Sequence, residues 1–126
     1  MAAVVIDCLD PESVSEFWSA ALGRPVTPGE DGVWWWLDLG TQGTGILFLL
    51  NPDRKVVKNR VHLDLRPDDQ GREVERLISL GARTKDIGQG DTSWVVMADP
   101  EDNEFCVLEA RAAPADAPST SEASPA

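Results

Sequence analysis

The chain has 126 residues, enough for one compact domain and too few for two independent ones. Its 22 acidic residues outnumber its 11 basic residues, and the resulting net charge of −11 argues against nucleic acid or an anionic membrane as a partner. Apolar residues make up 42% of the chain, which can support a packed core, and no apolar run approaches the ~20 residues of a membrane span. Because the N-terminus has no signal-peptide pattern, we expect a cytoplasmic protein.

The first half of the chain is predicted to form a strand, a helix and three further strands. Residues 2–8 are apolar and β-branched, and they lead into Asp10, whose side chain can cap a helix that begins at Pro11. Gly23 closes the apolar stripe of that helix. Turn-rich segments then separate three strands, expected near Val26 and over residues 33–39 and 46–50.

The second half repeats this order. Residues 60–66 alternate as a strand, and Pro67-Asp68-Asp69 marks the start of a second helix, which ends in Leu-Gly as the first one does. Further strands are expected over residues 83–87, 92–98 and 104–109. Neither half can bury its sheet alone, so modules 1–52 and 58–109 must pack together, within one chain or between chains. Residues 110–126 are mostly Ala, Pro, Ser and Thr, and predict a disordered tail after a domain of residues 1–109.

Three blocks of the sequence resemble a known superfamily. They are VVIDCLDPESVSEFWSAALG, NRVHLDLRPDD and WVVMADPEDNEFCVLE, and in this order they are similar to the glyoxalase/bleomycin resistance/dioxygenase (vicinal oxygen chelate, VOC) proteins, closest to the glyoxalase-like branch of high-GC bacteria. The resemblance covers residues 3–109. It implies an α+β fold of two βαβββ modules, whose curved mixed sheets enclose a pocket. In the segment ADPEDN, Asp102 replaces the glycine that the family usually has.

The same resemblance implies where a metal would lie. Enzymatic members hold a divalent metal through four side chains from the first and last strands of both modules. Carried over by motif, these positions are Ala3, Leu49, His62 and Cys106. Ala3 and Leu49 have no donor atom, and a catalytic site needs about three protein ligands. We therefore predict no cofactor, with a divalent metal that also uses Asp7 or Asp64 as the alternative.

Three polar side chains on predicted strands are candidate site residues. His62 is the only histidine, and because Val61 and Leu63 beside it are apolar, we expect the imidazole to face the pocket. There it would act as a base or a hydrogen-bond donor, or simply pair with a carboxylate. Asp7 and Asp64 lie in mid-strand, where a buried carboxylate needs a partner. They either recognise a cationic ligand or serve as a general base, or they pair with His62 and nearby arginines.

Tryptophan and cysteine residues complete the candidates. In the triplet Trp34–Trp36 the first and third rings share one face of a strand, where they form an aromatic pocket wall, a dimer anchor or a half-buried packing surface. Trp94 can belong either to the rings that line a pocket or an interface or to those that pack within the fold. Cys106 is expected to face the pocket as a packing residue rather than a nucleophile, and Cys8 to face the helix.

Together these features predict a protein that binds a small aromatic or cationic molecule and forms a homodimer. The pocket is expected to be acidic, lined by Asp7, Trp34, Trp36, Leu49, His62, Asp64, Trp94 and Cys106, and without a complete metal site. The alternative is a lyase- or isomerase-type enzyme, metal-dependent or not, in which His62 is the catalytic residue and the pocket carboxylates assist. A third interpretation is an interaction module with no ligand. A metal-dependent glyoxalase activity is not expected, because the metal ligands are incomplete.

Overall fold

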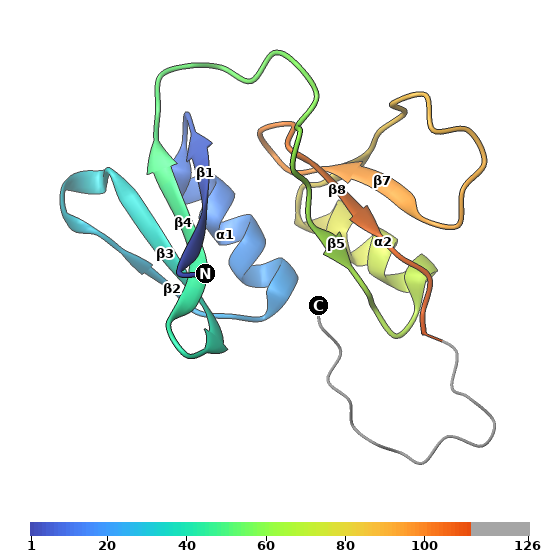
Figure 1. The fold of residues 1–126 in the computed structure, drawn as a ribbon, viewed down its shortest axis with the longest axis horizontal. Coiled ribbons are helices and arrows are strands. Elements are labelled where there is room, and N and C mark those ends of the chain that lie inside the picture. Colours follow the sequence, from blue (N-terminus) through green and yellow to red (C-terminus); the bar gives the residue numbers. More distant parts are fainter. Residues whose placement is uncertain (112–126) are drawn as a thin grey trace.

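Two four-stranded sheets, each with its own helix, make up the protein (Figure 1). The structure is a computed structural model that describes residues 1–111, so residues 112–126 of the predicted tail lie outside the described residues. The strand order is β1-β4-β3-β2 in the first sheet and β5-β8-β7-β6 in the second. The fold is therefore α+β with two βαβββ modules, as the sequence predicts.

The first module follows the sequence prediction closely. Its elements are β1 (Ala3–Cys8), α1 (Pro11–Leu22), β2 (Val26–Pro28), a short 3-10 turn (Glu30–Gly32), β3 (Trp34–Thr41) and β4 (Thr44–Leu50). The Asp10 carboxylate accepts a hydrogen bond from Ser13 N and so caps α1, while Gly23 ends the helix with a left-handed φ of 64°. β1 runs parallel to β4, and β3 is antiparallel to both of its neighbours.

The second module has the same order but shorter strands. Its elements are β5 (Asp64–Leu65), α2 (Gln70–Leu80), β6 (Arg83–Thr84), β7 (Val95–Ala98) and β8 (Glu104–Val107). The Asp69 side chain caps α2 by accepting from Arg72 N, so the helix begins three residues later than Pro67 suggests. The strand predicted over 60–66 is regular only at residues 64 and 65, because it pairs with β8 alone and only over that stretch.

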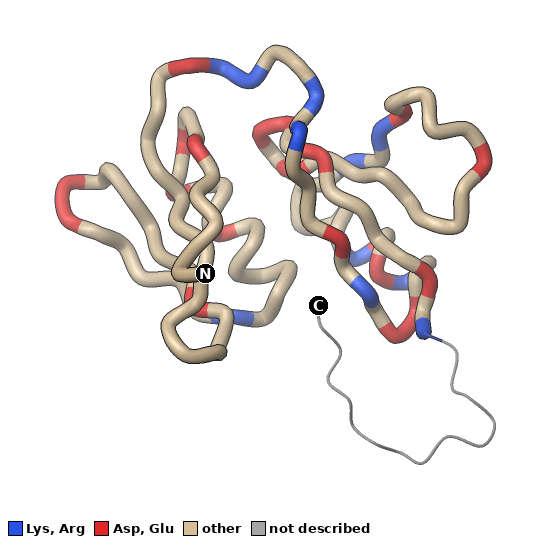
Figure 2. Tube along the Cα trace, in the orientation of Figure 1, with Lys and Arg blue, Asp and Glu red and all other residues tan. Residues whose placement is uncertain are grey.

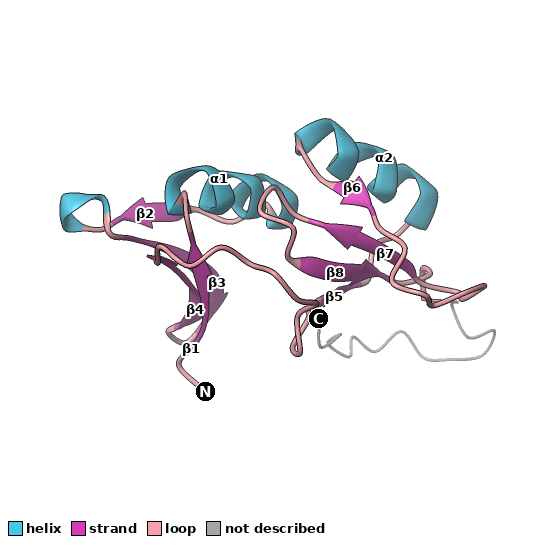
Figure 3. Ribbon diagram, turned by 90° about the horizontal axis from the view of Figure 1, so that it is seen from above, coloured by secondary structure: helices cyan, strands magenta, loops and turns pink. Residues whose placement is uncertain are grey.

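Both helices lie on the same side of the two sheets (Figure 3). One apolar core fills the space between helices and sheets, and it is shared by the modules: the ring centroids of Trp18 in α1 and Phe105 in β8 are 4.9 Å apart, and Phe17 contacts both rings. The modules thus pack against one another within the chain. Each sheet leaves its face opposite the helix uncovered in the described part of the chain.

Within residues 1–111, neither α1 nor α2 is long and apolar enough to cross a membrane.

Candidate functional site

A cavity of about 380 Å³ lies on the open face of the second sheet. That volume falls in the range of roughly 300–1,000 Å³ that small-molecule sites occupy. Side chains at alternate positions of β8 and of the strand containing β5 form its floor, and the segment after β6 supplies part of its wall. It is lined by Lys58, His62, Asp64, Ile87, Gln89, Trp94, Val96, Glu104, Cys106 and Leu108.

Three donor side chains meet on the floor of this cavity. His62 and Asp64 are two residues apart and so share one face, and the parallel register places Asp64 directly beside Cys106 of β8. His62 Nε2 lies 3.1 Å from Asp64 Oδ1, and the three donor atoms all lie within 4.8 Å of one another. Burial and the nearby Asp64 carboxylate raise the pKa of the Cys106 thiol, against the opposing charge of Lys58. Cys106 is therefore protonated at neutral pH when no ion is bound.

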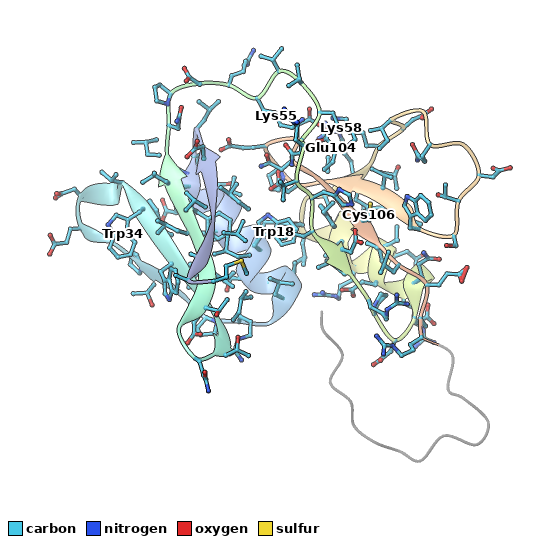
Figure 4. The ribbon with its side chains drawn as sticks, viewed as in Figure 1. Trp18, Trp34, Lys55, Lys58, Glu104 and Cys106 are labelled. Carbon is cyan, nitrogen blue, oxygen red and sulfur yellow. The ribbon has the colours of Figure 1, made fainter. Side chains whose placement is uncertain are left out.

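Glu104 lies two residues before Cys106 on the same face and has a structural task. Its side chain is 2% exposed and accepts hydrogen bonds from Lys55 Nζ (2.9 Å), Lys85 Nζ (2.6 Å) and Asn59 N (2.7 Å). Burial by itself would raise the pKa of Glu104, but these three donors outweigh it and lower the pKa to about 2. Glu104 is thus ionised and binds the segment between β4 and β5, which we call the connector between the modules. It is not available as a base (Figure 4).

A second cavity, of about 340 Å³, lies between the modules. Its lining includes Asp7 of β1, Glu101 of the β7–β8 turn, and Lys55, Asn59 and His62 of the segment before β5. His62 therefore lines both cavities, whereas Asp7 lines only this one.

The turn between β7 and β8 holds the modules together at this second cavity. Asp99 is fully buried and accepts from Trp18 Nε1 at 2.9 Å, and also from the backbone N–H groups of Glu101 and Asn103. Burial raises the pKa of Asp99, although these hydrogen bonds oppose the rise. Glu101 in turn accepts from the backbone of the first module, at Leu9 N and Asp10 N. These contacts join the two modules through hydrogen bonds as well as through the apolar core.

Asp102 occupies the position in this turn where the family usually has glycine. Its φ of 70° is left-handed, a conformation that glycine adopts without cost and that aspartate tolerates better than most residues. Its carboxylate pairs with Lys85 at 2.8 Å and with Arg83. The turn thus places a charged residue at its left-handed position, where the carboxylate forms ion pairs.

The structure brings together four of the eight predicted pocket residues. His62, Asp64, Trp94 and Cys106 line the cavity on the second sheet. Asp7 lines the cavity between the modules. Trp34, Trp36 and Leu49 belong to the first sheet and line neither cavity; Figure 4 shows Trp34 far from Cys106. Cys8 is buried beneath α1, on the side predicted for it. The homodimer stays a prediction.

Lysine side chains offset part of the acidic charge of this cavity. The first 50 residues contain one basic residue, Arg24, so Lys and Arg gather on the connector and the second module (Figure 2). Lys58 lines the cavity, and the charge of Glu104 is matched by Lys55 and Lys85. Asp64 is therefore the carboxylate that faces the cavity without a lysine or arginine partner among the described residues.

Sequence reasoning missed the residues that support the site. Lys55 lies in the segment between β4 and β5, and its side chain is 16% exposed and bound to Glu104. The two-residue spacing of Glu104 and Cys106 in NEFCV could have placed the glutamate on the pocket face. No pattern in the sequence could have paired Trp18 with Asp99, because that contact depends on how the modules pack.

The four-ligand metal arrangement implied by the family does not fit this chain. Ala3 and Leu49 occupy two of its positions on the first sheet and offer no donor atoms. His62 and Cys106 occupy the other two positions, and both belong to the second module.

A family model for the glyoxalase-like domain matches residues 3–108, and the chain belongs to that family. A search of curated proteins found no significant match.

Solved structures share the fold at low identity. A glyoxalase/bleomycin resistance protein/dioxygenase family enzyme from Burkholderia phytofirmans is 19% identical, with a TM-score of 0.63 over 84% of this chain and 94% of that one. The fosfomycin resistance protein FosX from Listeria monocytogenes, in a structure with Mn(II), is 13% identical, with a TM-score of 0.67 over 88% and 90%. An antibiotic binding protein from a Streptomyces species is 19% identical, with a TM-score of 0.57 over 88% and 95%. These matches place the chain in the VOC fold, which hosts enzymes and binding proteins alike.

Proposed function

We propose that this chain is a small-molecule-binding member of the glyoxalase-like family, and that its ligand occupies the cavity on the second sheet. The observation that carries the proposal is the lining of that cavity. Trp94 is 42% exposed and offers an open indole surface, with Ile87, Val96 and Leu108 also in the lining. An exposed tryptophan beside other apolar side chains favours a flat, partly apolar ligand.

Polar groups in the same lining would orient such a ligand. Asp64 is half-exposed and can accept a hydrogen bond or an ion pair from an amine, and the Trp94 ring can add a cation–π contact. Lys58 and Gln89 offer donors to a ligand oxygen. We therefore propose a ligand with an aromatic ring, one cationic or hydrogen-bond-donating group, and room for an acceptor near Lys58.

Calorimetric titration with matched cationic and neutral aromatic compounds tests this proposal. We expect Trp94→Ala to weaken binding by about 5- to 150-fold, since the loss of one aromatic stack removes roughly 1–3 kcal/mol. Trp34→Ala, on the first sheet, is the matched control and should leave the affinity unchanged. Binding that is insensitive to Trp94→Ala, or equally sensitive to Trp34→Ala, would place the ligand elsewhere.

One observation favours a second candidate, an enzyme that moves a proton. His62 Nε2 lies 3.1 Å from Asp64 Oδ1, so the carboxylate can orient an imidazole that also faces both cavities. This is the arrangement of a general base with its orienting partner. If a bound compound is slowly converted, His62→Gln should abolish conversion while leaving its affinity within about threefold; unchanged conversion would exclude His62 as the base.

A further inference from the structure

We propose that His62, Asp64 and Cys106 form a binding site for a single Zn²⁺-class ion on the floor of the second-sheet cavity. The second module would supply all three ligands. This differs from the four-ligand arrangement of the family, because Asp64 is not one of those positions and the first sheet contributes no ligand. The proposal shares its cavity with the proposed function but does not rest on it, since metal binding can be measured without an organic ligand.

The local backbone explains why the three donors converge. His62 and Asp64 alternate on one strand and project from the same face. Asp64 pairs in register with Cys106 of β8, and adjacent strands lie about 4.8 Å apart. The donor atoms lie within 4.8 Å of one another, and His62 Nε2 and Asp64 Oδ1 are already 3.1 Å apart. Donors around one tetrahedral zinc ion lie roughly 3–4 Å apart, given bonds of about 2.0–2.3 Å. Small side-chain rotations would therefore complete the site.

The chemistry of the donors selects the ion. A thiolate is a soft ligand that favours Zn²⁺ and Co²⁺ over Mg²⁺ and Mn²⁺, and an imidazole has the same preference. Coordination would release the thiol proton of Cys106 to solvent. Three protein ligands leave a fourth position, which would face the cavity and hold water or a ligand atom.

The surroundings allow an ion to enter and to be retained. The side chains of His62 and Asp64 are 41% and 50% exposed, while Cys106 is 7% exposed. An ion could therefore reach the two accessible ligands from solvent and bind the buried sulfur between the strands. Lys58 is the one lysine or arginine among the described residues that line this cavity, and it opposes a dication. Its Nζ donates to the backbone oxygen of its neighbour Asn59.

Cobalt spectroscopy tests the site through the sulfur. Chelator-treated protein is titrated with Co²⁺, and thiolate-to-cobalt charge transfer is followed in the near-ultraviolet, with Zn²⁺ added as a competitor. We expect one Co²⁺ per chain, a charge-transfer band, and displacement by one equivalent of Zn²⁺. Cys106→Ser should remove the band. Cys8→Ser, which changes the other thiol beneath α1, is the matched control and should keep it.

Two further variants keep the test decisive if Cys106→Ser perturbs folding. Asp64→Asn and His62→Gln change half-exposed side chains, and each should weaken Zn²⁺ binding by at least about tenfold with an unchanged circular dichroism spectrum. The proposal is overturned by the absence of a charge-transfer band in the wild type, by a band that survives Cys106→Ser, or by affinity unchanged in both further variants. Titration of the metal-free protein with aromatic compounds separately decides the proposed function.

Discussion

The two modules have the same element order, yet their open sheet faces differ in chemistry. On the first sheet this face carries Val5, Trp34, Trp36 and Leu49 with one carboxylate from β1, Asp7, whereas on the second sheet His62, Asp64 and Cys106 lie together beside Trp94. The turns before the last strand differ in the same way. The β3–β4 turn is exposed and glycine-rich. In the β7–β8 turn, the side chains of Asp99 and Glu101 accept hydrogen bonds from the first module. The same fold unit therefore provides a largely apolar open face in one copy and, in the other, an open face on which three donor side chains meet.

The largest expected effect comes from the buried carboxylate of the second turn. Asp99→Ala would leave the indole N–H of Trp18 and two backbone N–H groups without their acceptor, and should lower the free energy of unfolding by about 3–5 kcal/mol. Asp38→Ala is the control near the first turn, where an exposed carboxylate accepts from Gly40 N, and should cost less than about 1 kcal/mol. Urea unfolding measures both; equal losses would contradict the contrast between the turns.

Glu104 comes next, because its charge is buried against two lysines. Glu104→Gln should cost about 2–3 kcal/mol, since it leaves Lys55 and Lys85 near an uncharged amide in a largely buried place. Glu75→Gln, on the exposed side of α2, is the control and should fall within about 0.5 kcal/mol of the wild type. A loss below 1 kcal/mol for Glu104→Gln would show that the connector is held by other contacts.

A smaller effect distinguishes the two cavities. Asp64→Asn should weaken a cationic aromatic ligand roughly three- to tenfold, since an ion pair at a half-exposed carboxylate contributes about 0.5–1.5 kcal/mol. Asp7→Asn changes a carboxylate that lines only the cavity between the modules and should have no effect. Calorimetric titration of both variants measures the difference. The reverse ranking would move the ligand into the cavity between the modules.

The smallest effect concerns Asp102, where backbone preference and charge oppose one another. Asp102→Gly relieves a left-handed φ but removes the ion pairs with Lys85 and Arg83, so its stability should stay within about 1 kcal/mol of the wild type at low salt. Because salt screens the ion pairs and leaves the backbone term unchanged, the variant should gain on the wild type in 1 M salt. Asp102→Asn, which removes the charge but keeps a side chain at this φ, should show the same gain in salt and lack the stability that backbone relief gives the glycine variant.

The pH dependence of stability also tests the role of Asp102. The hydrogen bond from Lys85 lowers the pKa of Asp102, against a smaller effect of burial, so this carboxylate stabilises the fold above its unfolded-state pKa near 3.8. That contribution is lost as the pH falls through the lower folded-state pKa. The stability difference between wild type and Asp102→Gly should therefore shift toward the variant below about pH 4 in pH-dependent unfolding. A difference that is constant from pH 7 to pH 3 would contradict this.

Local signals in the sequence were sufficient for the elements, and partly sufficient for the site. Asp10 and Asp69 cap the helices that they predict, and period-two alternation places His62 and Asp64 on the open face. The distribution of the pocket residues was not predictable, because alternation identifies a face but not which sheet or cavity that face belongs to. For that reason the sequence predicts one pocket for Asp7, Trp34 and His62, although Asp7 and Trp34 belong to the first sheet and His62 to the second module. The approach of Cys106 to Asp64 depends on strand register, which pattern alone does not fix.

The burial of Trp18 against Asp99 has an optical consequence. Trp18 is 1% exposed and lies where α1 meets the second module, whereas Trp94 is 42% exposed and faces the ligand cavity. An indole in an apolar, rigid setting emits at shorter wavelength than one in water. The blue edge of the intrinsic emission should therefore report whether the modules remain docked, and quenching at the red edge should report what enters the cavity. With Trp34, Trp35 and Trp36 replaced by phenylalanine, only Trp18 and Trp94 would emit, and one emission spectrum would follow both events.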